Sequence, residues 1–163
     1  MNKYIKKFPK TPSFKQNGFD GYVCNLENSN VSITYENVYK GHEKYCTNTV
    51  STLIYYVISG NGKFKINDNI YDVSAEDIIE IPPNTKFIFA GEMKLLLLMN
   101  PAFDSKNEIV GEENDLYYIY DNLNNQDEFE KAAQILDKTI NCDNIQAMSK
   151  DDINNATSRK MKF

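Results

Sequence analysis

Short apolar stretches, separated by turn-forming residues, run through residues 21–100 of the chain. In residues 63–66 and 86–90 apolar and polar residues alternate, which is typical of a strand with one buried face. Residues 51–60 and 93–100 are almost continuously apolar, which indicates strands covered on both faces. The breaks between the stretches are rich in Gly, Asn, Asp, Ser and Pro, residues that favour tight turns.

The spacing of these stretches predicts the fold class. Seven or so short strands follow one another at hairpin spacing without a helical stretch between them, which indicates an antiparallel sandwich or barrel. The expected strands are residues 21–26, 31–39, 51–60, 63–66, 70–73, 78–81, 86–90 and 93–100. We expect turns at residues 60–62 and 91–92 to separate neighbouring strands.

The two ends of the chain differ from this central pattern. Within residues 125–140, apolar positions recur at the spacing of one helix face. We therefore divide the chain into an N-terminal arm (1–20), a barrel (21–120), a C-terminal helical segment (121–145) and a polar, flexible tail (146–163). Residues 116–120 are one further candidate strand.

Composition and charge limit the binding partners and the cellular compartment that we expect for the protein. The 163-residue chain has a net charge of −5, whereas binding to nucleic acid requires clustered Lys and Arg. Its longest apolar stretch, residues 95–99, is too short to span a bilayer. Three widely spaced cysteines, Cys24, Cys46 and Cys142, do not indicate a disulfide framework. We expect a cytoplasmic protein that binds neither nucleic acid nor membrane.

Residues 56–85 resemble the two conserved motifs of the cupin family. Residues 56–62 (YVISGNG) match the family's strand and Gly-x-Gly turn, and residues 81–85 (IPPNT) match its Pro-Pro-Gly-Thr corner. Residues 75–77 (AED) stand where the family has Gly-Asp. The resemblance, over roughly residues 35–100, implies an all-β fold: a cupin-type antiparallel β-barrel, also called a double-stranded β-helix or jelly roll. The helical pattern adds a short C-terminal helix.

Metal-dependent cupins bind their ion with a His-x-His pair and a Glu in the first motif and a third His in the second. In this chain those positions fall on Cys46, Asn48, Leu53 and Phe87, or on Thr47, Thr49 and Thr52 for the first motif after a one-residue slip. Leu and Phe carry no ligand atoms. We therefore expect no metal and no other cofactor. The single histidine, His42, precedes the first motif in a loop and is not expected to bind a metal.

Strand alternation indicates what the barrel contains instead of a metal site. The candidate ligand-binding residues of the interior are Tyr35, Tyr45, Cys46, Asn48, Leu53, Tyr55, Phe64, Phe87 and Phe89. A mostly apolar cavity with a few polar groups is typical of small-molecule sites. The alternative is that these side chains fill the barrel, as in many small barrels.

Three functions are compatible with such a barrel. The first is a metal-independent domain that binds a small metabolite in an aromatic, tyrosine-edged cavity. The second is a metal-free isomerase, epimerase or lyase of carbohydrate or small-molecule metabolism that uses Tyr and Glu. Its candidate bases are Glu36, Glu43, Glu80 and Glu92. The third is a structural dimerisation domain with a filled barrel. A tyrosine–carboxylate pair inside a cavity would indicate the enzyme.

The resemblance also implies a homodimer, because cupins commonly pair through sheet edges and exchanged N-terminal segments. The arm at residues 1–18 and an outward row of Ile54, Tyr56 and Ile58 are the candidate contacts. The same row is equally suited to pack under the C-terminal helix.

Overall fold

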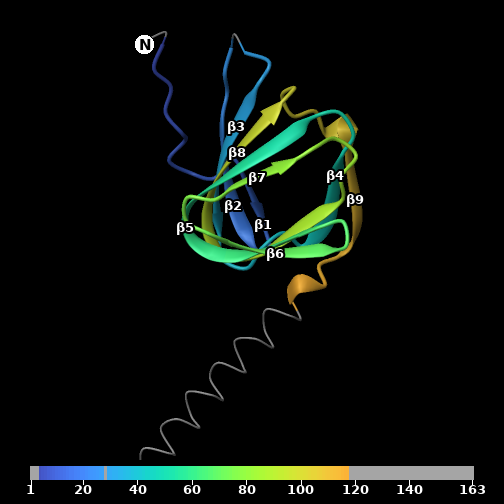
Figure 1. Ribbon diagram of the computed structural model, residues 1–163. Helices are drawn as coiled ribbons and strands as arrows, with labels where there is room; N and C mark the ends of the chain where they lie inside the picture. The colour runs from blue at the N-terminus through green and yellow to red at the C-terminus, as the bar shows by residue number, and fades with distance from the viewer. Residues whose placement is uncertain (1–3, 28, 118–163) are drawn as a thin grey trace, which may run out of the picture. The chain divides into compact units, whose positions relative to one another are not determined.

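The computed structural model describes residues 4–27 and 29–117 of the chain (Figure 1). The chain divides into two compact units, residues 1–121 and 122–163, and the described residues belong to the first. They form β1 (Phe14–Gln16), β2 (Phe19–Cys24), β3 (Ser32–Val38), β4 (Lys44–Asn48), β5 (Thr52–Ile66), β6 (Asn69–Ser74), β7 (Ile78–Ile81), β8 (Phe87–Asn100) and β9 (Glu108–Glu113), with a short 3-10 helix η1 (Ser105–Asn107).

The predicted antiparallel β fold is confirmed, because every pairing between these strands is antiparallel. The predicted C-terminal helix lies outside the described residues. The described part of the chain contains no helix of the length and apolarity that crossing a membrane requires. Residues 14–20 of the predicted arm carry β1 and the start of β2.

The two longest strands, β5 and β8, run through both layers of the barrel (Figure 1). Residues 52–57 of β5 pair with residues 95–100 of β8, and residues 59–66 of β5 pair with residues 87–94. The first pair of segments continues into β7 on one side and into β3, β2 and β1 on the other. The second pair continues into β6 and toward β4 and β9.

The turns expected at residues 60–62 and 91–92 are wrong, because both segments are bends within continuous strands. Gly60 and Gly91 have φ values of 86° and 141°, a region that residues with a side chain rarely adopt. Gly62 faces Gly91 across the ladder. A Cβ on Gly91 would lie 2.5 Å from the Cα of Gly62. The two strands therefore bend together where neither backbone carries a side chain.

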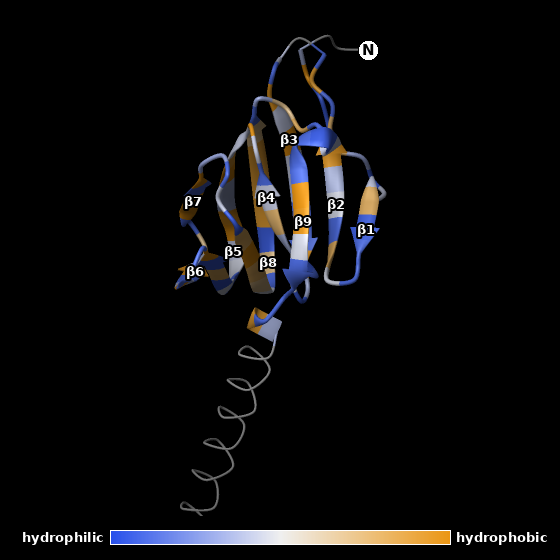
Figure 2. Ribbon diagram, turned by 90° about the vertical axis from the view of Figure 1, so that its right-hand side faces the viewer, coloured by the Kyte–Doolittle hydropathy of each residue, from blue (hydrophilic) through white to orange (hydrophobic). Residues whose placement is uncertain are grey.

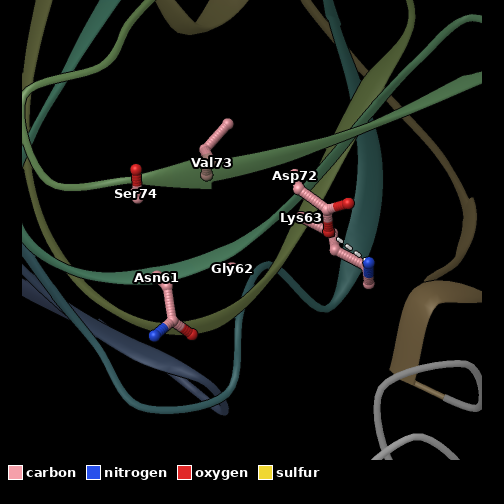
Figure 3. Close-up of a pocket in the computed structure, with 6 residues that line it drawn as sticks. All are labelled: Asn61, Gly62, Lys63, Asp72, Val73 and Ser74. Atoms are coloured by element: carbon pink, nitrogen blue, oxygen red, sulfur yellow. Dashed lines mark hydrogen bonds and ion pairs between the residues drawn. The ribbon is translucent and has the colours of Figure 1, made fainter.

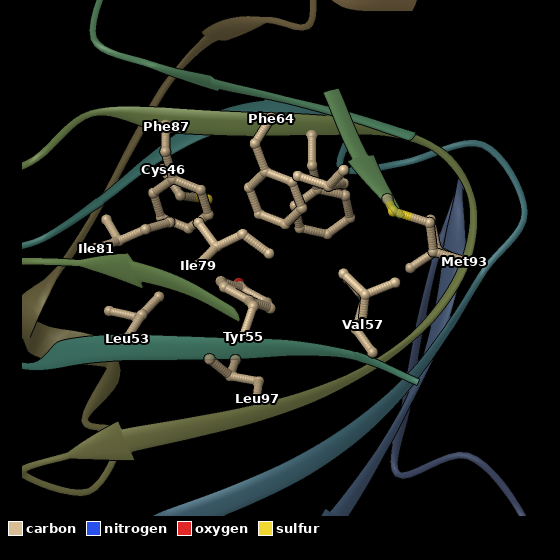
Figure 4. Packing of buried hydrophobic residues seen from close by; sticks show 14 of the residues in the cluster. Cys46, Leu53, Tyr55, Val57, Phe64, Ile79, Ile81, Phe87, Met93 and Leu97 are labelled. Carbon is tan, nitrogen blue, oxygen red and sulfur yellow. The ribbon is translucent and has the colours of Figure 1, made fainter. Parts of the chain in front are cut away.

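Inward-facing side chains of both layers form an aromatic and aliphatic core (Figure 4). Leu53, Tyr55 and Val57 of β5 face inward, as the alternation predicts, and each is at most 5% exposed. Phe64 and Phe89 are fully buried, with ring centroids 5.2 Å apart. Tyr55 lies against Phe64 at 5.3 Å. This packing closes the interior beside the cavity described below.

The segment after β8 departs from the sequence expectation. β9 was not predicted, because half of its sequence EIVGEE is charged and most of it is exposed. Figure 2 shows the apolar middle of this strand between polar ends. Leu116 and Tyr117, in the candidate strand at residues 116–120, are helical, and the rest of that stretch lies outside the described residues.

Candidate functional site

A cavity of about 420 Å³ lies between the two layers of the barrel, within the range typical of small-molecule sites. Its polar lining includes Thr34, Glu36, His42, Cys46, Asn48, Tyr55 and Glu108, and its apolar wall includes Phe19, Leu53, Phe87, Leu97 and Met99. Phe14 and Phe103 also line it and are 38% and 48% exposed, which places them at its mouth. A filled barrel does not describe this structure.

His42 reaches the cavity from the loop between β3 and β4. Its backbone N–H donates to the carbonyl of Phe89 at 3.1 Å, and its own carbonyl accepts from the Asn114 side chain at 2.6 Å. Its ring packs against Phe19 and Phe89, with centroids 5.3 and 5.8 Å away. Burial lowers the pKa of His42. The imidazole is therefore neutral near pH 7 and able to accept a proton.

Cys46 of β4 lies directly beside the His42 ring. Its Sγ is 3.4 Å from Nε2 of His42. Burial, together with the nearby carboxylate of Glu108, raises the pKa of Cys46 to about 12. Because the thiolate is the nucleophilic form, this cysteine is a hydrogen-bonding neighbour of His42 rather than a nucleophile.

Glu36 of β3 is a carboxyl group buried in the cavity wall. The residue is 4% exposed, and its Oε2 has no hydrogen-bond partner among the described residues. Burial raises the pKa of Glu36 to about 8. The group is therefore mostly protonated near neutral pH, and it can donate a hydrogen bond as well as accept one.

Asn48, at the end of β4, presents a fixed amide to the same cavity. Its Oδ1 accepts hydrogen bonds from the backbone N–H groups of Val50 and Ser51, at 3.0 and 2.6 Å. These two bonds identify the oxygen and direct Nδ2 the other way. The Nδ2 atom is buried without a partner in the described part of the chain.

Tyr55 of β5 supplies a phenol to the cavity. The side chain is 3% exposed, and burial raises its pKa well above the ordinary value, so it stays neutral. No hydrogen bond joins Tyr55 to Glu36 within residues 4–27 and 29–117. A hydrogen-bonded tyrosine–carboxylate pair does exist outside the cavity, where the Tyr45 hydroxyl donates to Asp115 at 2.6 Å.

Eight of the nine residues proposed from the sequence divide into three groups. Cys46, Asn48, Leu53, Tyr55 and Phe87 line the cavity. Phe64 and Phe89 lie in the core, fully buried. Tyr45 packs in a second buried cluster with Ile88, Ala90 and Leu116. The ligand-binding role of these residues stays a prediction.

Tyr35 was expected in the interior of the barrel, and this expectation is wrong. On β3 the buried positions are Thr34, Glu36 and Val38, so Tyr35 lies on the opposite face of the strand. There its ring lies 5.6 Å from that of Tyr22 and 6.2 Å from that of Phe8.

Sequence reasoning did not identify three polar residues of the site, Thr34, His42 and Glu108. Glu36 was one of four candidate bases, and the other three, Glu43, Glu80 and Glu92, are exposed on the surface. The available signal was the alternation along β3, which places Thr34 and Glu36 on one face.

The residues at the family's metal positions do not fit a metal. Leu53 and Phe87 present only hydrocarbon, and the Asn48 side-chain oxygen already accepts hydrogen bonds from two backbone N–H groups. Across the described ranges, no group of three His, Cys, Asp or Glu side chains could hold a metal ion. No step of the chemistry below is therefore routed through a metal.

Two other hollows lie on the surface, and each contains an ion pair. One follows the hairpin of β5 and β6, where Lys63 pairs with Asp72 (Figure 3). The other surrounds Tyr45, where Lys65 pairs with Asp115 at 2.5 Å. Exposed ion pairs of this kind contribute little to stability.

Comparison with known proteins finds similarity through structure. No family model matches the sequence, and a search of curated protein sequences finds no match. A structure of a Streptomyces Pac13 variant with uridine is 31% identical, with a TM-score of 0.64, over 69% of this chain and 93% of that chain. Pac13 itself, described as a unique nucleoside dehydratase, is 29% identical, with a TM-score of 0.59, over 66% and 86% of the two chains. Ectoine synthase from P. lautus shares the fold at 12% identity, with a TM-score of 0.53, over 62% and 81%.

Two layers that share β5 and β8 around a ligand-sized cavity define a double-stranded β-helix barrel. The chain belongs to the cupin superfamily.

Proposed function

We propose that the cavity binds a nucleoside or a close analogue, and that the protein is a metal-independent lyase that eliminates water from it. The observation that carries the proposal is the position of His42, neutral and facing a ligand-sized cavity. The similar Pac13 structures with uridine include a histidine-to-glutamine variant and tyrosine-to-phenylalanine variants. Because this chain has one histidine, His42 is its only candidate for a corresponding role.

Dehydration requires one group that moves a proton twice, or two groups that each move it once. Neutral His42 accepts a proton from a substrate carbon, and the electron pair of that C–H bond forms the carbon–carbon double bond. The hydroxyl on the neighbouring carbon leaves and takes the proton from the His42 imidazolium. The products are water and the alkene, and His42 returns to its neutral form. The neutral Tyr55 phenol is a donor for charge that develops on the substrate.

The shape and lining of the cavity support a ligand with a flat ring. Phe14 and Phe103 are exposed at the mouth, where a planar base can pack against aromatic rings. Polar groups lie further in, on β3, β4 and β5.

The experiment compares wild-type protein with His42→Gln. Uridine binding is measured by calorimetry. Loss of water is measured by mass spectrometry on a panel of nucleosides and of their carbonyl derivatives, in which the carbonyl acidifies the neighbouring C–H. We expect His42→Gln to keep binding within about threefold and to lower turnover by at least about a hundredfold. Glu80→Gln, on the exposed side of β7, is the matched control. A wild-type protein that binds no nucleoside would overturn the proposal.

A second candidate, binding without conversion, is favoured by one observation. The Pac13 variants replace two different tyrosines, whereas Tyr55 is the one tyrosine that lines the cavity among the described residues. This candidate predicts that uridine binds equally well to wild type and His42→Gln, and that no nucleoside in the panel loses water.

A further inference from the structure

Two buried polar atoms in the cavity have no partner in the described ranges, Oε2 of Glu36 and Nδ2 of Asn48. Buried polar groups in native proteins are almost always hydrogen-bonded, because an unpaired one loses its contacts with water and gains nothing in return. Both residues are at least nine-tenths buried, with exposures of 4% and 5%. A ligand that completes both hydrogen bonds removes this cost.

The two atoms come from different layers of the barrel. Glu36 lies on β3, between Gly21 of β2 and Leu95 of β8 in the ladders. Asn48 lies on β4, opposite Glu108 of β9. A ligand that contacts both therefore has polar groups that point in different directions rather than along one planar edge.

The surroundings of Glu36 leave its proton available to a ligand. The titratable groups that line the cavity with it are Lys15 of β1, His42 of the β3–β4 loop, Cys46 of β4, Tyr55 of β5 and Glu108 of β9. No hydrogen bond or ion pair joins Glu36 to a side chain in the described part of the chain. Burial raises its pKa to about 8. The carboxylic acid can therefore both donate to and accept from a hydroxyl group.

We propose that Glu36 and Asn48 form a two-sided clamp for the sugar hydroxyls of the ligand, so that the ribose lies deep in the cavity and the base lies at the mouth. The inference rests on the proposed function in taking the ligand to be a nucleoside. A hydroxyl group accepts from the Asn48 amide and exchanges a hydrogen bond with Glu36. The 2′- and 3′-hydroxyls of ribose are adjacent, and each can donate and accept and can turn about its C–O bond to meet a group from either layer, whereas the donors and acceptors of a base are fixed in one plane.

The test measures the affinity of the full-length protein for uridine, 2′-deoxyuridine and 3′-deoxyuridine by calorimetry. We expect wild type to bind at least one deoxy analogue roughly tenfold more weakly than uridine, the cost of one lost hydrogen bond. Glu36→Leu removes both carboxyl oxygens. Asn48→Ser keeps a side-chain oxygen that can accept from the backbone N–H groups of Val50 and Ser51. Its shorter side chain removes the Nδ2 donor that faces the cavity. Each variant should bind uridine roughly tenfold more weakly and lose the preference for the hydroxylated ligand.

Two matched controls separate recognition from damage to the fold. Glu80→Leu and Asn37→Ser make the same changes on β7 and β3 outside the cavity, and both should keep the wild-type preference. Damage to the barrel lowers affinity for all three ligands alike, so the ratio between uridine and the deoxy analogues reports the clamp alone.

The outcomes for the clamp and for the lyase are distinct. The clamp is overturned if both deoxy analogues bind wild type as tightly as uridine, if the variants keep the preference, or if no riboside binds. Hydroxyl-dependent binding without any loss of water overturns the lyase and leaves the clamp standing. Elimination that depends on His42, together with equal binding of uridine and the deoxy analogues, overturns the clamp and leaves the lyase standing.

Discussion

At the scale of single residues, the cavity gathers acids that burial keeps in their protonated forms. Burial is the largest cause that raises the pKa of Glu36, Cys46 and Tyr55. The negative charge of Glu36, when present, raises the pKa of the other two further. Near neutral pH the three groups are hydrogen-bond donors beside a neutral His42, an arrangement suited to an uncharged, hydroxyl-bearing ligand.

Glu36 predicts a specific dependence of stability on pH. Its pKa rises from an ordinary value of 4.5 to about 8 on folding, so the folded state holds a proton that the unfolded state releases. The contribution of Glu36 to stability is therefore fully present below pH 4.5 and is lost as the pH rises toward about 8, by a few kcal/mol in total. Below about pH 6.5 the lowered pKa of His42 acts in the opposite sense, because the unfolded state then binds the extra proton.

Between about pH 6.5 and pH 8 the effect of Glu36 can be measured without the opposing effect of His42. Urea unfolding across this range should show a decline in the free energy of unfolding for wild type and a flatter profile for Glu36→Gln. Glu80→Gln should keep the wild-type slope. The remaining titratable groups that face Glu36, namely Lys15, Cys46, Tyr55 and Glu108, are present in every variant. Equal slopes in wild type and Glu36→Gln would show that Glu36 does not titrate in this way.

At the scale of the strands, two glycine bends determine the path of β5 and β8. Gly91 has a φ of 141°, and a Cβ there would lie 2.6 Å from the Asn61 carbonyl oxygen. We expect Gly91→Ala to lower the free energy of unfolding by at least about 2 kcal/mol, because it adds backbone strain to a steric clash. The control is Gly111→Ala, where the nearest atom would be 3.3 Å away, with a cost below about 1 kcal/mol. Equal losses in urea unfolding would contradict the assignment of the bend.

The sequence predicted the inner face of β5 and the antiparallel fold because period-two alternation is a local property. It failed at residues 60–62 and 91–92 because glycine signals a hairpin turn and a strand bend alike. It misplaced Tyr35 because β3 carries Ile33 and Tyr35 on its outer face, so hydrophobicity did not identify the inner one. It did not place His42 in the site because that loop is held by Asn114, 72 residues away in the chain.

At the scale of the whole molecule, the outer face of the layer that contains β7 carries exposed apolar side chains. Tyr56, Ile58 and Ile78 are 36%, 42% and 69% exposed, and Tyr56 pairs with Ile78 across the ladder. The homodimer implied by the sequence stays a prediction, and this row of Tyr56, Ile58 and Ile78 is the surface to test, because Ile54 of the expected row is only partly exposed.

Light scattering after size exclusion measures the oligomeric state directly. If the row is the contact, wild type elutes with the mass of a dimer at micromolar concentration and Ile78→Lys shifts it to the mass of a monomer. Ile109→Lys, at a residue of β9 that is 57% exposed, is the control and should leave the mass unchanged. A wild-type monomer would contradict the prediction.

The sharing of β5 and β8 between the two layers has a kinetic consequence for any bound ligand. Separating the layers breaks the ladder hydrogen bonds of both at once, which amounts to unfolding the barrel. The mouth is bordered instead by β1, which pairs with β2 through only three residues and contributes Phe14 and Lys15 to the lining. We therefore expect the residence time of a ligand to depend on the stability of this short edge strand more than on separation of the two layers.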